Sequence, residues 1–116
     1  MVVGGRIELK ELFEGMATVA FDPEEAKGWN TVIQYDITGE GGGKYYLEIR
    51  DKRCRLFEGE TKDYRLKISS DINDWFAITE GRLSGQKAFF SGKLKAEGNM
   101  ADLFKMQSVF QGKAER

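Results

Sequence analysis

Three groups of residues in this sequence have types and spacings that protein chemistry commonly uses. A run of glycines precedes Lys44, acidic residues occur in close pairs, and Cys54 is the one cysteine among 116 residues. These groups would serve phosphate binding by a glycine-rich loop, acid–base or metal chemistry, and nucleophilic attack by a thiolate.

The glycine run over residues 39–43, GEGGG, does not have the spacing of a phosphate-binding loop. That motif needs glycine where Thr38 stands and serine or threonine where Tyr45 stands, and it leads into a helix. The residues after the run instead alternate between apolar and polar, as they do in a strand. The run therefore predicts the flexible tip of a hairpin.

The sequence contains no histidine, which removes most other catalytic and metal-binding arrangements. Neither a Ser-His-Asp triad nor a His-ligated metal site can form without it. The acidic pairs Glu24-Glu25 and Asp71 with Asp74 lie where a helix N-terminus favours negative charge, and Cys54 lies on the apolar face of a predicted strand. We therefore expect neither an enzyme nor a bound metal, nucleotide or redox cofactor.

A cluster of positive charge marks one predicted turn, formed by Arg50, Lys52, Arg53 and Arg55. Such residues contribute about 1 kcal/mol each near an anionic membrane, so transient contact with a membrane surface is one interpretation. A solvated turn is the alternative, because Glu48, Asp51 and Glu58 lie close by in the sequence and largely neutralise the cluster.

Large, adaptable apolar side chains gather in the last third of the chain, in greater number than one face of a sheet requires. Most clusters of this kind form a core, but this one is also suited to bind an apolar ligand. The candidate ligand-binding residues are Trp75, Phe76, Phe89, Phe90, Met100, Leu103, Phe104, Met106, Gln107 and Phe110.

Gln107 stands out in this cluster because it is polar. At 100° per residue it falls between Met100 and Leu103, close to Phe104, in the middle of the apolar face of the last predicted helix. A glutamine there must find a hydrogen-bond partner or face a cavity. We therefore expect Gln107 to contact a polar group of the ligand or an ordered water.

Hydrophobic periodicity predicts the elements that position these residues. A period of 3.6 or a capping pattern indicates the helices, which are expected over residues 7–20, from Asp22-Pro23 to Gly28, from 70–74 to Gly81, over 84–90 and over 100–111. A period of 2 indicates the strands, which are expected over residues 31–38, 45–50, 53–58, 64–69 and 93–97. The first four predicted strands follow one another with mostly short connections.

Length and charge place the chain among small globular domains. Its mass of 13.2 kDa allows one domain with a real core, and a net charge of −1 disfavours nucleic-acid binding. We expect a flexible N-terminus over residues 1–5, one domain over 6–111 and a polar tail over 112–116. No segment has the apolar length of a membrane-spanning helix, and no secretion or peroxisomal signal is recognised. A single cysteine suits a reducing compartment. We therefore expect a cytoplasmic location.

Three segments of the sequence carry a resemblance to a known family. They are VIQYDITGEGGGKYYLEIRD, ISSDINDWFAITEGRLSGQKAFFSGKLKAEGNM and LFKMQSVF, preceded by the corner Phe21-Asp22-Pro23-Glu24. In this order they cover nearly the whole chain and resemble the lipid-binding domain of the sterol carrier protein family, type two.

The resemblance implies an α+β fold, in which helices cover one side of a five-stranded sheet and an apolar tunnel runs between the two layers. It also implies a non-catalytic carrier that holds a sterol, fatty acid, fatty acyl thioester or similar lipid. Relatives of this family are often fused to lipid-metabolising enzymes. The alternative is accordingly a non-catalytic scaffold or accessory domain that oligomerises or docks onto such an enzyme; the oligomeric state is not predicted.

Overall fold

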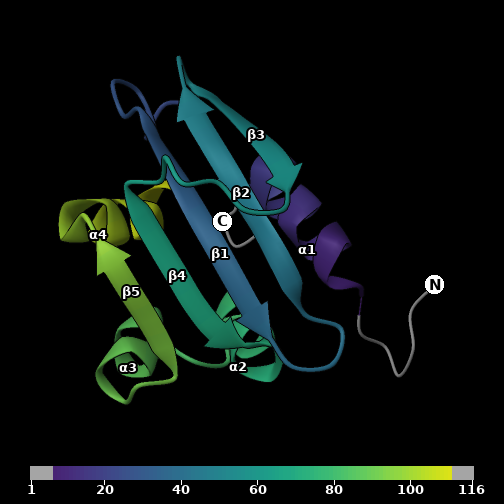
Figure 1. Ribbon diagram of the computed structural model, residues 1–116. Coiled ribbons are helices and arrows are strands. Elements are labelled where there is room, and N and C mark those ends of the chain that lie inside the picture. Colours follow the sequence, from purple (N-terminus) through teal and green to yellow (C-terminus); the bar gives the residue numbers. More distant parts are fainter. Residues whose placement is uncertain (1–6, 111–116) are drawn as a thin grey trace.

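The computed structural model describes residues 7–110, and a five-stranded mixed sheet is its main feature (Figure 1). The strands are β1 (Thr31–Thr38), β2 (Gly43–Arg50), β3 (Arg53–Glu58), β4 (Leu66–Asp71) and β5 (Leu94–Gly98). The sheet order is β3-β2-β1-β4-β5, in which β1 and β4 run parallel and the other neighbours antiparallel.

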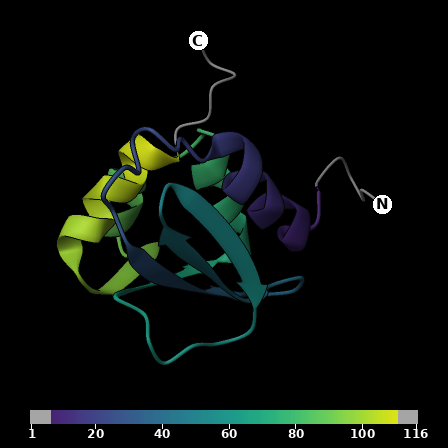
Figure 2. The same cartoon turned by 90° about the horizontal axis from the view of Figure 1, so that it is seen from above.

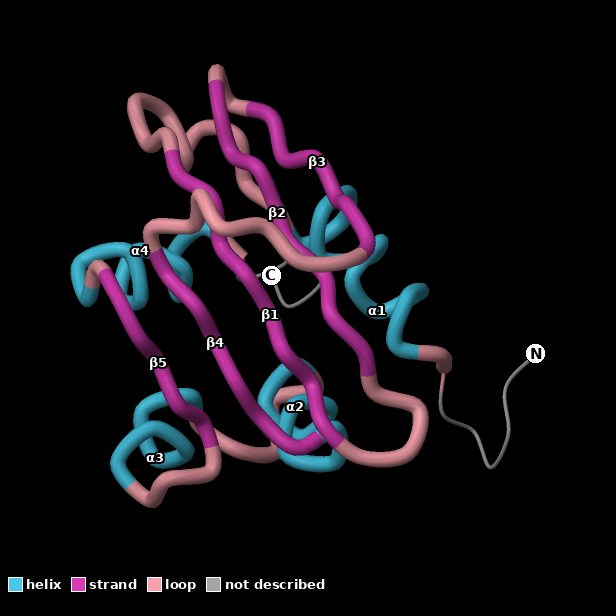
Figure 3. The backbone as a smooth tube through the Cα atoms, viewed as in Figure 1, coloured by secondary structure: helices cyan, strands magenta, loops and turns pink. Residues whose placement is uncertain are grey.

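The helices of the described chain lie on one face of this sheet, as Figure 2 shows from above. They are α1 (Leu9–Gly15), the π-helix η1 (Met16–Ala20), α2 (Ile72–Thr79), α3 (Gly85–Phe90) and α4 (Met100–Val109) (Figure 3). The α+β class and the one-sided helical layer predicted from the sequence are confirmed. The predicted segments 1–5 and 112–116 lie outside the described residues.

Two tight turns build the first three strands into a meander. The glycine run forms the tip between β1 and β2, and at Gly42 a Cβ atom would lie 2.2 Å from the carbonyl oxygen of Ile37, so only glycine fits there. Asp51 and Lys52 join β2 to β3 with φ angles of 54° and 63°, the backbone of a turn whose twist matches an antiparallel pair. Both hairpins confirm the sequence predictions.

The connection from β3 to β4 crosses the face of the sheet that has no helices (Figure 2). Gln34 of β1 holds this segment: its Oε1 accepts a hydrogen bond from the backbone of Thr61 at 2.8 Å, and its Nε2 donates to the carbonyl of Gly59 at 3.2 Å. The crossing keeps Tyr64 out of the sheet, so β4 begins at Leu66, two residues later than predicted.

The N-terminal helix is α-helical only over its first half. Apolar spacing predicts one continuous helix over residues 7–20, but Met16–Ala20 is wound as a π-helix. Gly15 at the junction has a weak helical preference, and the hydroxyl of Thr18 donates to the carbonyl of Glu14 at 2.7 Å. The wider winding begins where the regular helix is weakest.

The short helix predicted after Asp22 is wrong, because the structure has turns over residues 23–28. The capping part of the prediction holds, since Oδ1 of Asp22 accepts from the backbone N–H groups of Glu24 and Glu25 at 3.1 and 3.4 Å. The chain leaves the helical direction at Gly28, where φ is 79°, before a second turn can form.

The helices that follow β4 begin at side chains able to cap them. Asp71 accepts from the backbone of Asn73 at 2.8 Å, Ser84 from that of Lys87 at 3.2 Å, and Asn99 from that of Asp102 at 2.9 Å. Each cap satisfies one N–H group that the helix leaves free. The predicted starts of α3 and α4 are therefore correct to within one residue, and α2 begins inside the predicted capping stretch 70–74.

Aromatic rings fill the layer between the sheet and the α1 side of the helices. Phe13 is fully buried, and its ring lies 5.0 Å from that of Tyr35, 4.9 Å from that of Tyr45 and 5.9 Å from that of Trp75, centroid to centroid. Such contacts add to the free energy of burial. This aromatic cluster closes one half of the layer.

Candidate functional site

The other half of the layer contains a cavity of about 520 Å³, bordered by α2, α3 and α4. Residues of η1, β4 and β5 complete its wall, so the two ends of the described chain meet around it. Its volume is that of a small-molecule site. The structure does not show the predicted tunnel; a cavity occupies this position.

Most of the residues predicted to bind a ligand lie in the wall of this cavity. They come from three separate helices, each set in place by its own cap, and their side chains are aromatic, aliphatic or sulfur-containing apart from one amide. The predicted residues that line the cavity are Trp75, Phe89, Phe90, Leu103, Phe104, Met106, Gln107 and Phe110.

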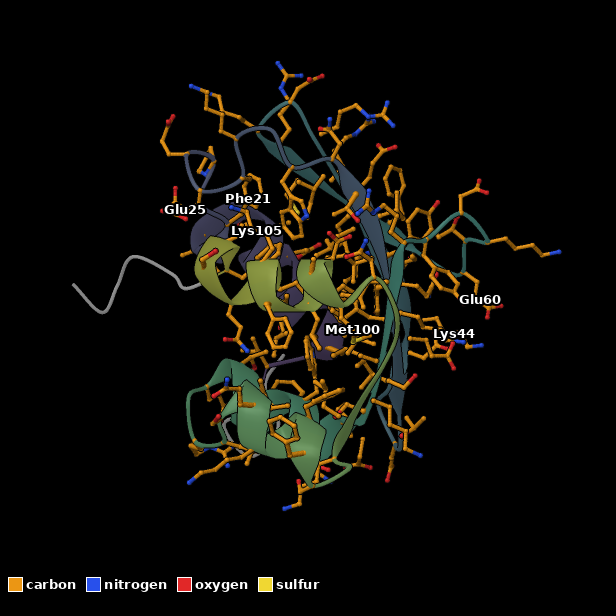
Figure 4. All side chains as sticks on the ribbon, turned by 90° about the vertical axis from the view of Figure 1, so that its left-hand side faces the viewer. Phe21, Glu25, Lys44, Glu60, Met100 and Lys105 are labelled. Carbon is orange, nitrogen blue, oxygen red and sulfur yellow. The ribbon has the colours of Figure 1, made fainter. Side chains whose placement is uncertain are left out.

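Two of the predicted residues do not line the cavity. Phe76 is 1% exposed and belongs to the core, because it stands one position round α2 from Trp75 and turns away from the cavity wall. Met100 is 37% exposed at the first turn of α4, where it lies outside the cavity (Figure 4). The sequence pattern places both residues on apolar faces of helices, but it does not show that Phe76 is buried in the core or that Met100 lies outside the cavity.

Gln107 lines the cavity, and its side chain is exposed. Its side chain makes no hydrogen bond to the other described residues. A Cβ atom built on Gly85 would lie 3.8 Å from its Nε2, which puts the amide opposite the start of α3. Gln107 is thus a polar group on the rim of the cavity, free to hydrogen-bond with something outside the chain.

Several wall residues did not appear among the candidates. Met16 and Ala20 of η1 belong to the apolar face predicted for the first helix, but nothing in the sequence shows which helix shares a cavity with α4. Ile68 and Leu94 enter the wall through the pairing of β4 with β5. None of the described residues that line the cavity is ionisable.

Among the described residues, two buried polar atoms have no hydrogen-bond partner: the hydroxyl of Tyr35 and Nε1 of Trp75. The two rings are neighbours, with centroids 5.4 Å apart, and Trp75 also lines the cavity. Burial raises the pKa of the Tyr35 hydroxyl well above its usual value, and the nearby Cys54 raises it further. An unpartnered buried donor is rare in folded proteins, because it loses its hydration without gaining a hydrogen bond.

A buried carboxylate fixes α4 against the sheet and the loop before β4. Oδ2 of Asp102 accepts from the hydroxyl of Thr31 at 2.6 Å and from Nε of Arg65 at 3.1 Å, while Oδ1 accepts from Nε1 of Trp29 at 2.9 Å. Asp102 is only 3% exposed. This cluster of donors around one carboxylate sets the position of the helix that carries four of the cavity residues.

A second, shallower groove lies across the molecule between η1 and β3, and it contains Cys54. Burial raises the pKa of the Cys54 thiol to about 12, so the thiol is protonated at neutral pH and is a poor nucleophile. The basic turn beside this groove is paired with acids, since Lys52 lies 3.4 Å from Glu24 and Arg55 lies 3.8 Å from Glu48.

Neither groups able to hold a metal ion nor helices able to span a membrane occur within residues 7–110. No cluster of three or more cysteine, aspartate and glutamate side chains comes close enough to bind a metal there. No helix in that range has the length and hydropathy of a membrane span.

Comparison with known proteins relates this fold and cavity to one family. The family model described as the SCP-2 sterol transfer family matches residues 9–111. Hydroxysteroid dehydrogenase-like protein 2 of Bos taurus is 33% identical over 84 residues, which are 72% of this chain and 20% of the bovine protein. The chain thus spans about a fifth of the length of this relative.

Two solved structures share the fold. The palmitated SCP2L2 of Aedes aegypti has a TM-score of 0.74 at 19% identity, covering 90% of this chain and 95% of that one. The stereoselective inverting sec-alkylsulfatase of Pseudomonas sp. has a TM-score of 0.79 at 14% identity, covering 90% of this chain and 16% of the sulfatase. The fold therefore occurs both by itself and as a small part of an enzyme.

Proposed function

The chain belongs to the SCP-2 sterol transfer family, and from this we propose that it is a carrier that binds one apolar lipid molecule in the cavity between α2, α3 and α4. The observation that carries the proposal is the wall itself: apolar side chains from three helices surround about 520 Å³ that they do not fill. A core of this composition normally packs without such a space.

Burial of the acyl chain supplies the free energy of binding. A 16-carbon chain contributes on the order of 10 kcal/mol gross, at about 0.8 kcal/mol per methylene, before the costs of ordering. A bilayer offers the same burial, so the cavity needs only to rival the membrane for lipids to exchange. A carrier of this kind binds reversibly and needs no chemical step.

The neutral wall indicates how a lipid lies in the cavity. No ionisable side chain lines it among the described residues, so a carboxylate placed deep inside would lose its hydration without gaining a cation. The apolar chain therefore enters, and the polar head stays at the rim. Gln107 is exposed there and is the residue we propose to hydrogen-bond that head.

The ligand class follows from the same features. Sterols, fatty acids and fatty acyl thioesters all combine an apolar body with a polar end, and the palmitated relative from Aedes aegypti favours a fatty acyl chain among them. We propose no catalytic role for this chain, because its cavity lacks a titratable pair and its one cysteine is held protonated.

Titration of lipid-free protein with a fluorescent fatty acid tests the proposal. We expect saturable one-to-one binding and a change in tryptophan emission that a Trp75→Phe variant loses. Trp29 is kept, because its Nε1 donates to Oδ1 of Asp102. Met106→Glu places a charge in the cavity wall and should abolish binding, whereas Met100→Glu changes the same residue type on the same helix outside the cavity and should not. Equal binding by both variants would contradict the proposed site.

The variant Gln107→Leu tests the role of the rim amide. Because this side chain makes no hydrogen bond within the described chain, we expect equal or higher thermal stability and a weaker preference for lipids with polar heads. A loss of stability with unchanged lipid preference would mean that Gln107 braces the helix instead.

An accessory role is a second candidate, favoured by the small share of its enzyme-related relative that this chain spans. In that role the domain docks onto a lipid-metabolising enzyme or oligomerises, and its exposed apolar surface is covered by protein. A stable oligomer of lipid-free protein, measured by light scattering, would support it.

The cytoplasmic location expected from the sequence is part of the carrier proposal and is tested by imaging the tagged protein in cells.

A further inference from the structure

A buried donor in the wall of the cavity lacks an acceptor among the described residues. Trp75 of α2 lines the cavity and is only 3% exposed, and its Nε1 makes no hydrogen bond within the described chain. An indole nitrogen donates one hydrogen bond and accepts none. The wall therefore contains a position at which an acceptor atom from outside this chain would be stabilised.

The second unpartnered group belongs to the neighbouring ring. The hydroxyl of Tyr35, on the central strand β1, is buried without a partner among the described residues, and the ring centroids of Tyr35 and Trp75 lie 5.4 Å apart. A phenolic hydroxyl both donates and accepts. The two rings, which we call the Trp75–Tyr35 pair, thus carry two free donors and one free acceptor at one place in the layer.

The side chains packed around the pair cannot supply the missing partner. Phe13 lies against both rings, at 5.0 Å from Tyr35 and 5.9 Å from Trp75, and it has no polar atom. On the cavity side, the buried wall residues Ile68 and Leu103 are also apolar. A partner for the pair therefore has to arrive through the cavity, either on the ligand or as a water molecule.

The pair lies at the inner end of the cavity. Phe90 is 80% exposed and Phe104 is 55% exposed, and together with the exposed Gln107 they mark the rim. Trp75 instead adjoins the closed aromatic cluster around Phe13. A ligand whose head group stays at the rim would therefore bring the opposite end of its apolar body toward the pair.

The acceptor that suits this place is uncharged. No ionisable side chain lines the cavity among the described residues, and burial raises the pKa of the Tyr35 hydroxyl well above its usual value, so the surroundings disfavour negative charge. A carboxylate here would lose its hydration without gaining a cation. A hydroxyl or keto oxygen loses far less hydration and can accept from neutral donors.

We propose that the Trp75–Tyr35 pair selects oxygenated lipids, in which a hydroxyl or keto oxygen remote from the head group accepts a hydrogen bond from Nε1 of Trp75 and forms another with the hydroxyl of Tyr35. The ligand class is a lipid with polar groups at both ends, such as a fatty acid hydroxylated far from its carboxylate. This inference rests on the proposed carrier function. An internal water that partners the pair with any lipid is the alternative that the experiment separates.

Competition against a fluorescent fatty acid tests the proposal with a series of hydroxypalmitates. The hydroxyl is moved from the carbon beside the carboxylate to the terminal carbon, and the affinity of each isomer is divided by that of palmitate. This ratio is compared between wild type and the variants Trp75→Phe and Tyr35→Phe, because the cost of dehydrating the ligand hydroxyl then cancels. For an isomer with a remote hydroxyl, we expect each variant to lower the ratio by about tenfold.

Two control variants leave the pair intact. Tyr45→Phe removes a hydroxyl from the same aromatic cluster, whose Tyr45 ring lies 4.9 Å from that of Phe13, and Phe89→Leu shrinks a ring in the cavity wall without removing a donor. Neither should change the ratio for any isomer by more than about twofold. Tyr35→Phe keeps the shape of the ring, so it tests the proposal even if Trp75→Phe fails to fold.

Two results of the competition would overturn the proposal. An internal water predicts that the ratios stay the same in Trp75→Phe and Tyr35→Phe for every isomer. A dependence on these variants that is confined to the isomer with its hydroxyl beside the carboxylate would place the pair at the head group instead.

The indole N–H signals in nitrogen–proton correlation spectra give a direct readout. The signal of Trp75, assigned by its loss in Trp75→Phe, should move downfield when an isomer with a remote hydroxyl replaces palmitate. The signal of Trp29 should stay in place, because its Nε1 already donates to Oδ1 of Asp102 at 2.9 Å. The same Trp75 signal with both lipids would contradict the proposed hydrogen bond.

The two proposals fail in different ways. If palmitate itself does not bind to wild type, the carrier function is contradicted. If palmitate binds but neither the ratios nor the Trp75 signal depend on a remote hydroxyl, the selection of oxygenated lipids alone is contradicted.

Discussion

The two halves of the helical layer are built from the same kinds of side chain but pack differently. Under α1, Phe13 contacts the rings of Tyr35, Tyr45 and Trp75 and leaves no exposed surface. Between α2, α3 and α4, rings of similar size surround a cavity, and Phe90 is largely in solvent. Apolar composition alone therefore does not determine whether a region becomes a closed core or a ligand site.

Trp75 stands at the boundary between the two halves. One side of it faces Phe13 and Tyr35, and another side lines the cavity. The closed half is tightly packed, while the open half surrounds an unfilled space. Substitutions matched across this boundary test whether the two halves differ in this way.

The largest difference is expected between Phe13→Ala and Phe89→Ala. In the closed half the deletion opens a new void, and we expect a loss of about 3–5 kcal/mol in the free energy of unfolding. In the open half the ring is only half-buried beside an existing space, so we expect a loss of about 1 kcal/mol. Urea denaturation of both variants measures the contrast, and equal losses would refute it.

Asp102→Ala should give the next largest effect, because it removes the carboxylate that holds α4. Its partners Thr31 and Trp29 would lose their acceptor inside the protein, and we expect a loss of about 2 kcal/mol. Hydrogen exchange in α4 should also accelerate. The control Lys44→Ala breaks an exposed ion pair with Glu60 at 2.9 Å on the far side of the sheet (Figure 4) and should cost under about 1 kcal/mol.

The strands and capped helices were accessible to sequence reasoning because their signals are local. The alternation in residues 31–38 and 53–58 gives β1 and β3 with their observed bounds, and Asp71, Ser84 and Asn99 mark the helix starts. The parallel pairing of β1 with β4 depends on a crossing loop held by Gln34, a contact between residues far apart in sequence, and no local period reveals it.

The sequence predicts most of the residues of the candidate site, but it does not predict how deeply each of them is buried. Apolar spacing on α3 and α4 identifies most of the wall, yet it cannot separate Trp75 from the neighbouring Phe76, which turns into the core. It also places Gln107 in the middle of the apolar face of α4, although this side chain is exposed. The anchor at Asp102 joins residues up to 73 positions apart and has no sequence signature.

Alkaline pH should lower the stability of the protein through the buried thiol of Cys54, which lies in the groove between η1 and β3. The pKa of Cys54 is raised to about 12 by burial, so the folded protein keeps a proton that the unfolded chain releases near pH 9. Stability from this group is complete below about pH 9 and falls as the pH rises toward 12, by about 1 kcal/mol at pH 10. Chemical denaturation at pH 8 and pH 10 measures this decline in the free energy of unfolding, and Cys54→Ala should make it smaller. A decline of the same size in the variant would contradict the raised pKa.

The smallest effect is expected for Tyr35→Phe. The hydroxyl of Tyr35 is buried without a partner, so its removal should leave the free energy of unfolding unchanged or raise it by up to about 1 kcal/mol. Thermal unfolding measures this. A clear loss of stability would mean that the hydroxyl is hydrogen-bonded to an internal water, and the closed half would then be less tightly packed than described.

The most direct test of the central claim, that the open half of the layer is a lipid site, is a palmitate titration of lipid-free protein followed by amide chemical shifts. The account predicts saturation at one palmitate per chain, with the shifts concentrated in η1, α2, α3 and α4 and nearly absent around the groove at Cys54. Shifts centred on β3 and the basic turn, or no saturable change at all, would contradict it.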